Sequence, residues 1–261
     1  MPEHAAPAWF VVAERELRDL WLSGRALALM VAYTAVMSGS TYLVAVNQDL
    51  HFLEQREAVS LTLRVAVVVG GLLVVLVAAD AISGERERGT LETLLLTPAS
   101  RRSLVLGKGA AAISLWVAAY LLALPYAWWL GRDVNTFGPA AAGGLVVGTL
   151  LALLLGGVGL LVSMFSGSNL LSLSISFFVL IALYAPNQMP TESVRSWAGE
   201  LLLRVDPFTG GLPYLDKVII NGQSAGQSAD LLAVPLLTAV LVPGIALLVA
   251  GRLTLLPRGR S

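Results

Sequence analysis

The chain has 261 residues, of which 56% are hydrophobic and only 13% are charged, whereas an ordinary soluble domain carries about 25% charged residues. This composition excludes most soluble folds, and the balance of 17 basic against 17 acidic residues gives no net charge that would attract nucleic acid. The sequence has no cysteine and only two histidines, His4 and His51, which lie outside the apolar segments. It therefore predicts no catalytic residue and no metal site.

Residues 8–24 predict an amphipathic helix that lies along the membrane surface. Apolar side chains recur there at steps of three and four residues, and charged side chains occupy the opposite face. The apolar positions are Phe10, Ala13, Leu17, Leu20 and Trp21. A simple interfacial anchor without a partner is the alternative interpretation.

Six segments approach or reach the length of a membrane span, which is about 20 mostly apolar residues for a helix. They are residues 26–46, 61–82, 109–130, 140–165, 170–186 and 231–250. The fifth is the shortest and follows the fourth after four residues, which fits either a helical hairpin or a partly re-entrant segment. The predicted fold class is an all-α integral membrane protein that forms one transmembrane domain over residues 1–261.

The basic residues predict the orientation. Eleven of them flank one side of the six spans and six flank the other, and the more basic side normally faces the cytoplasm. We therefore expect a multi-pass protein of a bacterial-type plasma (inner) membrane, with both termini and the loop after the second span in the cytoplasm.

Two spans carry patterned small or polar residues. In the fourth, Ala or Gly recurs every four residues from residue 140 to residue 156, which predicts a close helix-packing surface within the subunit or against a second one. In the fifth, Ser172, Ser176 and Phe177 are candidates to line a transport pathway. Alternatively, these serines bond to their own helix or pack against a neighbouring one.

The long segment between the fifth and sixth spans predicts short external helices. Apolar residues from Val194 to Val205 follow a helical period. Asp206-Pro207 and Gly210-Gly211 predict breaks, and residues 212–220 form a second apolar piece. We expect an interfacial or re-entrant cap here, and an ordinary ordered loop is the alternative.

The loop between the second and third spans carries a distinctive charged motif. It begins Glu85-Arg86-Glu87-Arg88-Gly89-Thr90-Leu91-Glu92 and continues to Leu94 and Leu95. The pattern predicts a short, exposed helix that presents leucines and carboxylates to the cytosol, with Thr97-Pro98 starting the next helix. Because both ends of this helix join spans, it could act as a lever for a soluble partner. A solvated linker is the alternative.

This motif, with Pro98, Arg101 and Gly107-Lys108 after it, resembles the loop after the second span in ABC-2 type transporter permeases. The resemblance implies the membrane subunit of an exporter, in which the N-terminal helix and the loop dock and couple the ATPase. It also implies an identical or homologous second permease subunit, two cytoplasmic ABC ATPase subunits, and contact with membrane lipids. The second and fifth spans would border a pathway for a lipophilic or amphiphilic substrate.

Nucleotide chemistry is expected in the partner. The sequence contains no G-x-x-x-x-G-K-[ST] motif, which is the usual phosphate-binding loop of an ATPase. ATP and magnesium would therefore be used by the partner ATPase, and this chain would bind no cofactor. A secondary transporter or channel and a non-transporting membrane scaffold are the alternative functions.

Overall fold

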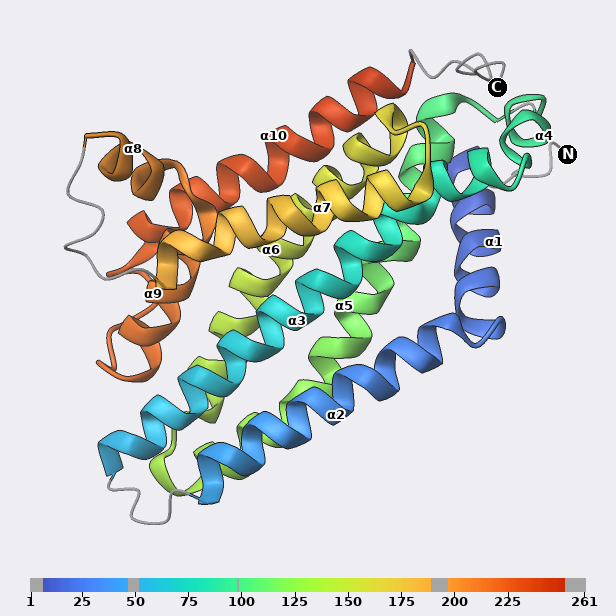
Figure 1. Ribbon diagram of the computed structural model, residues 1–261. Coiled ribbons are helices and arrows are strands. Elements are labelled where there is room, and N and C mark those ends of the chain that lie inside the picture. Colours follow the sequence, from blue (N-terminus) through green and yellow to red (C-terminus); the bar gives the residue numbers. More distant parts are fainter. Residues whose placement is uncertain (1–6, 47–51, 98, 189–196, 252–261) are drawn as a thin grey trace, which may run out of the picture.

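The computed structural model describes residues 7–46, 52–97, 99–188 and 197–251, and all regular secondary structure in these ranges is helical (Figure 1). Six helices are long and apolar enough to cross a membrane. They are α2 (Arg25–Val46), α3 (Phe52–Glu87), α5 (Arg101–Gly131), α6 (Phe137–Phe165), α7 (Asn169–Tyr184) and α10 (Ala233–Ala250). The predicted all-α fold with six spans is confirmed.

Helices α3 and α6 form the centre of the bundle, with more than half of each apolar segment buried, and the small residues of α6 let its neighbours approach closely. A Cβ added at Gly148 would overlap the indole of Trp116 in α5, and one added at Gly156 would lie 3.2 Å from Val74 in α3. The small-residue surface of the fourth span therefore packs against helices of the same chain. The helices α2, α7 and α10 lie at the periphery, and only about a fifth of the residues in the apolar stretch of each helix are buried.

The second and third spans are longer than predicted, so most of the predicted loop is helical. Helix α3 continues to Glu87 and ends at Gly89, whose φ of 73° is left-handed. The N–H of Thr90 bonds to the Glu85 carbonyl and the N–H of Gly89 to the Arg86 carbonyl, which is a Schellman ending. Helix α5 begins at Arg101 because the Ser100 hydroxyl accepts from the N–H of Ser103. Only α4 (Leu91–Leu95) lies between them.

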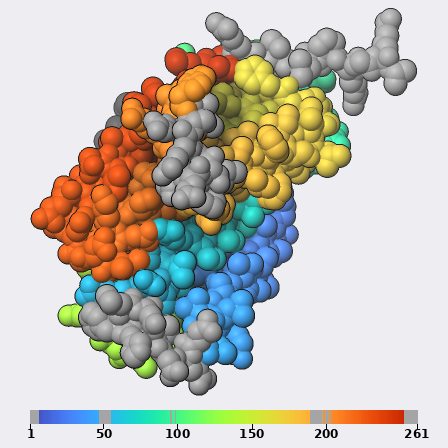
Figure 2. Space-filling view, turned by 60° about the vertical axis from the view of Figure 1, so that its left-hand side comes forward, coloured from blue at the N-terminus to red at the C-terminus, as the bar shows by residue number. Residues whose placement is uncertain are grey.

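Short helices occupy the two ends of the bundle. Helix α1 (Ala8–Leu22) lies at the same end as α4, while α8 (Trp197–Val205) and α9 (Pro207–Ile219) lie at the other (Figure 1). The 3-10 turns η1 (Arg132–Val134), η2 (Ala185–Gln188) and η4 (Ala229–Leu232) connect longer helices. On the face in Figure 2, α3 reaches the surface between α7, α9 and α2.

The segment between the fifth and sixth spans differs from its prediction in one respect. Helix α9 runs through Gly210 and Gly211 without a break. A Cβ at Gly210 would overlap the carbonyl oxygen of Leu231, and one at Gly211 would lie 3.0 Å from Val147 in α6. These glycines permit close packing rather than a turn. The beginning of the predicted amphipathic pattern, at Val194, lies outside the described residues, and α8 starts at Trp197.

Candidate functional site

A buried ammonium joins three helices beside the charged motif. The side chain of Lys108 in α5 is 4% exposed, and its Nζ lies 2.6 Å from Oε1 of Glu85 in α3 and 2.9 Å from Oε1 of Glu16 in α1. Removing an ammonium from water costs several kcal/mol unless nearby carboxylates offset it. Lys108 therefore needs both helices in place. We call Glu16, Glu85 and Lys108 the lysine cluster.

The next two motif residues bind two helix ends. Arg86 donates from Nη2 to the carbonyl of Met164 at 3.0 Å, and from Nη1 to the carbonyl of Ser166, at the C-terminal end of α6. Oε2 of Glu87 accepts from the N–H of Asn169, the first residue of α7, at 3.0 Å. A helix C-terminus is partially negative and an N-terminus partially positive. The cationic Arg86 therefore lies at the partially negative end of α6, and the anionic Glu87 lies at the partially positive start of α7.

A second charged cluster surrounds Asp80 in α3. Its Oδ2 accepts from Nη2 of Arg25 in α2 at 2.7 Å, and its Oδ1 accepts from Nδ2 of Asn169 in α7 at 2.8 Å. Nη1 of Arg88 lies 3.8 Å from the same Oδ1. A Cβ added at Gly84, one turn later, would overlap this carboxylate. We call Arg25, Asp80, Arg88 and Asn169 the aspartate cluster.

A cavity of about 220 Å³ lies between the two clusters and is lined by members of both. Its lining includes Glu16, Glu85 and Lys108 as well as Arg25, Asp80 and Arg88. The cavity therefore brings the charged groups of both clusters to one space.

Helix α4 is partly buried, which differs from the prediction that its leucines face the cytosol. Leu91 and Leu94 are 5% and 8% exposed, and Leu91 packs in the main core. Glu92 and Thr93 are exposed, and Leu96 is 85% exposed. The side chain of Leu95 lies outside the described part of the chain. Helix α4 therefore has one face anchored to the bundle and one free face in this single chain.

The candidate pathway residues lie on α7. Ser172 and Ser176 are fully buried, and Oγ of Ser172 donates to the carbonyl of Ala79 in α3 at 2.8 Å. The hydroxyl of Ser176 has no hydrogen-bond partner among the described residues. Phe177 is about half exposed on the outer side. The serines thus pack towards a neighbouring helix, and their role in a pathway stays a prediction.

Sequence reasoning did not identify five members of the clusters as site residues: Glu16, Arg25, Asp80, Lys108 and Asn169. A signal existed for Asp80, because Asp80, Gly84 and Arg88 recur at four-residue steps and so share one face of α3. A carboxylate inside a span is also a candidate functional group in itself. Glu16 gave no such signal, since its partner lies 92 residues away in the sequence.

Comparison with known families places these features in context. The sequence model of a family described as ABC-2 family transporter protein matches residues 10–249. The match therefore extends from α1 to α10 and includes both clusters. No curated protein gives a match to the chain.

Proposed function

Since the chain belongs to the ABC-2 family of transporter proteins, we propose that it is the permease subunit of an ATP-driven exporter whose ATPase subunits act on α4. Family membership makes it a membrane permease component of an ABC transporter. The proposal adds the direction of transport, the partners and the route by which the energy reaches the spans.

The observation that carries the proposal is the distribution of contacts from four consecutive residues. Glu85 reaches α1 and α5 through Lys108, Arg86 reaches the end of α6, Glu87 reaches the start of α7, and Arg88 approaches Asp80. Asp80 in turn binds Arg25 at the start of α2. A displacement of α4 would therefore act on five other helices through charged contacts.

The free face of α4 is the docking surface in this proposal. It presents the carboxylate of Glu92 beside the exposed side chain of Leu96, a combination of charge and apolar area suited to a protein interface. The buried Leu91 and Leu94 fix the opposite face to the bundle. A partner that moves α4 would then move the end of α3 with it.

The assembled exporter would contain two permease subunits, identical or homologous, and two cytoplasmic ATPase subunits that use ATP and magnesium. Both termini would be cytoplasmic, in a bacterial-type plasma membrane. The resemblance and the apolar surface of the spans support a lipophilic or amphiphilic substrate. Rotation of α3 against α7, past the buried Ser172 and Ser176, would open the pathway.

Two substitutions separate docking from transmission. The permease is reconstituted with its ATPase, and partner binding, ATPase activity and transport are measured for Glu92→Lys and Glu85→Gln. Glu92→Lys should weaken partner binding, while Glu85→Gln should preserve binding but uncouple ATP hydrolysis from transport. Asp133→Lys, an exposed change at the opposite end of the bundle, is the control. Unchanged binding in Glu92→Lys together with unchanged transport in Glu85→Gln would contradict the proposal.

A further inference from the structure

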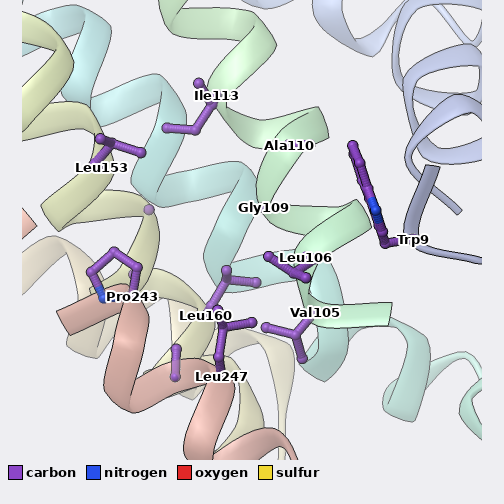
Figure 3. A pocket seen from close by; sticks show the side chains of 13 residues that line it. Trp9, Val105, Leu106, Gly109, Ala110, Ile113, Leu153, Leu160, Pro243 and Leu247 are labelled. Carbon is purple, nitrogen blue, oxygen red and sulfur yellow. The ribbon is translucent and has the colours of Figure 1, made fainter. Parts of the chain in front are cut away.

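A hollow between α5, α6 and α10 has no role in the coupling route. Its volume is about 330 Å³, which lies at the lower end of the range of roughly 300–1,000 Å³ for small-ligand sites. Figure 3 shows Leu153 and Pro243 on one side and the indole of Trp9, from α1, on the other. The lining is almost wholly apolar. It would therefore accept a hydrocarbon chain rather than a polar ligand.

Small residues create the hollow. Gly109 and Ala110 in α5 and Gly156 and Gly157 in α6 all line it, and none of them carries a side chain larger than a methyl group. Leu106, which is 43% exposed, and Ala110, which is also exposed, mark the side on which the hollow opens to the surroundings of the bundle. In a membrane these surroundings are lipid, because α5 and α10 are both spans.

The end of the hollow near α4 carries a cation. Arg101 lies one helical turn before Val105, which lines the hollow, and Nη1 of Arg101 donates to the carbonyl of Gly251 at 3.3 Å. Gly251 lies one turn after Leu247, which also lines the hollow. The guanidinium of Arg101 therefore bridges α5 and α10. It lies one helical turn, about 5–6 Å along the helix axis, beyond the apolar lining of the hollow.

Trp9 adds an interfacial group at the same opening. Its side chain is 43% exposed, and tryptophan is enriched at the level of the lipid headgroups. The apolar hollow matches the acyl chain of a phospholipid. The indole at its side and the guanidinium at its end match the headgroup. Basic sites between spans are known to favour anionic headgroups.

We infer that the hollow binds one acyl chain of an anionic phospholipid, with the headgroup beside Arg101 and Trp9. The lipid belongs to the leaflet at the α4 end of the bundle, which is the cytoplasmic leaflet in the proposed orientation. It links α1, α5 and α10, and no residue of α10 belongs to the lysine cluster or the aspartate cluster. The site does not depend on the ATPase, so it can be tested on the permease alone.

The test uses phospholipids that carry a photoactivatable diazirine in one acyl chain. The full chain is reconstituted in vesicles with labelled phosphatidylglycerol or labelled phosphatidylcholine, irradiated, and mapped by peptide mass spectrometry. Ala110→Phe fills the slot with an aromatic side chain. Ala28→Phe makes the same change on an exposed position of α2 near the same end and serves as the control.

Labelled phosphatidylglycerol should crosslink to residues 105–113 and 243–247, and Ala110→Phe should remove most of this signal while Ala28→Phe leaves it. Arg101→Gln, which keeps a donor for Gly251, should reduce the preference for phosphatidylglycerol about fivefold, the effect of roughly 1 kcal/mol for one basic side chain at a membrane surface. In the wild type, excess unlabelled phosphatidylglycerol should compete better than phosphatidylcholine.

Three results would overturn the inference. The first is uniform crosslinking along all exposed spans, which is the behaviour of bulk lipid. The second is equal competition by the two lipids. The third is protection of residues 105–113 and 243–247 only when permease subunits associate, which would assign the slot to a second copy of the chain.

Discussion

The two ends of α3 both carry charged contacts, but these contacts differ in reach. At the end near α4, charged groups of α3 contact α2, α5, α6 and α7, and Glu85 reaches α1 through Lys108. At the other end, Asp216 of α9 accepts from Arg64 and from Oγ of Ser60 at 2.6 Å, and Arg56 donates to the carbonyl of Ile220. The contacts at this other end join α3 to α9 and to Ile220, the residue that follows α9.

The difference suggests that the two ends of α3 have different functions. A change at the α4 end is shared by five other helices, α1, α2, α5, α6 and α7, which suits the transmission of a movement. A change at the α9 end affects the position of one short helix, which suits local closure of that end.

The largest effect is expected for Lys108→Met. The substitution leaves the carboxylates of Glu16 and Glu85 together in a buried site, and removing one partner of a buried ion pair typically costs about 3–5 kcal/mol. Thermal unfolding of the purified protein in detergent measures the loss. The triple variant Lys108→Met, Glu85→Gln, Glu16→Gln should recover much of it, because no unpaired charge remains.

Lys217→Met is the matched control at the other end of the bundle, on α9. It removes the same charge from a half-buried position and should change stability by only about 0.5 kcal/mol. Equal losses in Lys108→Met and Lys217→Met would mean that the lysine cluster is not a special link.

A smaller loss is expected for Asp216→Asn, which breaks the pair with Arg64. Both side chains are partly exposed, at 30% and 23%, so the cost should be about 1.5–3 kcal/mol, the usual range for hydrogen bonds to charged groups. Limited proteolysis should show faster cleavage near α9, while coupling of ATPase activity to transport persists. Loss of coupling equal to that in Glu85→Gln would remove the contrast between the two ends.

Gly84→Ala should change stability less but still disturb coupling. The new Cβ forces the Asp80 carboxylate out of its position, and an off-rotamer side chain costs about 0.5–1.5 kcal/mol of stability. Replacing a glycine inside a helix stabilises the folded state by roughly 0.5–1 kcal/mol, which offsets part of this cost. Gly39→Ala in α2, where the new Cβ would meet no atom within 4 Å beyond the adjoining backbone of its own helix, should only stabilise. Transport in the two variants, measured with the partner ATPase, should fall for Gly84→Ala alone.

How much of this could be predicted depends on whether a property is local. The six spans were predictable because hydrocarbon thickness fixes a length of apolar sequence. The Schellman ending was readable in principle, since Gly89 follows a helical pattern and glycine is the common residue in that position. Glu85 and Arg86 were instead predicted to be exposed in the loop after the second span, because alternating charges usually mark a solvent-exposed segment.

The partners of those charges were not predictable from spacing. Lys108 is buried only because α1 folds back against α5, and a Cβ at Gly107 would meet Val12 of α1 at 2.5 Å. Likewise, Gly210 and Gly211 have the composition of a turn, yet α9 uses them for close contact with its neighbours. In each case the deciding contact lies far away in the sequence.

The smallest effect concerns Asp206, which caps α9 by accepting from the N–H groups of Phe208 and Thr209. Burial raises the pKa of Asp206, and these hydrogen bonds only partly oppose the shift. The folded state thus binds a proton more tightly than the unfolded state, whose pKa is about 3.9, so stability should fall as the pH rises from about 4 through the folded pKa and then level off.

Asp206→Asn keeps the capping oxygen but removes the titration, so it should flatten this pH dependence in thermal unfolding measured at several pH values. Asp133→Asn, an exposed carboxylate at the same end, controls for the loss of one charge and should leave the slope in place. Among the described residues, the side-chain hydrogen bonds of Asp206 stay at the start of α9, where Oγ1 of Thr209 also donates to the carbonyl of Leu203. The change should therefore not alter ATPase coupling. An effect on coupling would show that the α9 end communicates with the α4 end after all, and that α3 carries one continuous link rather than two separate ones.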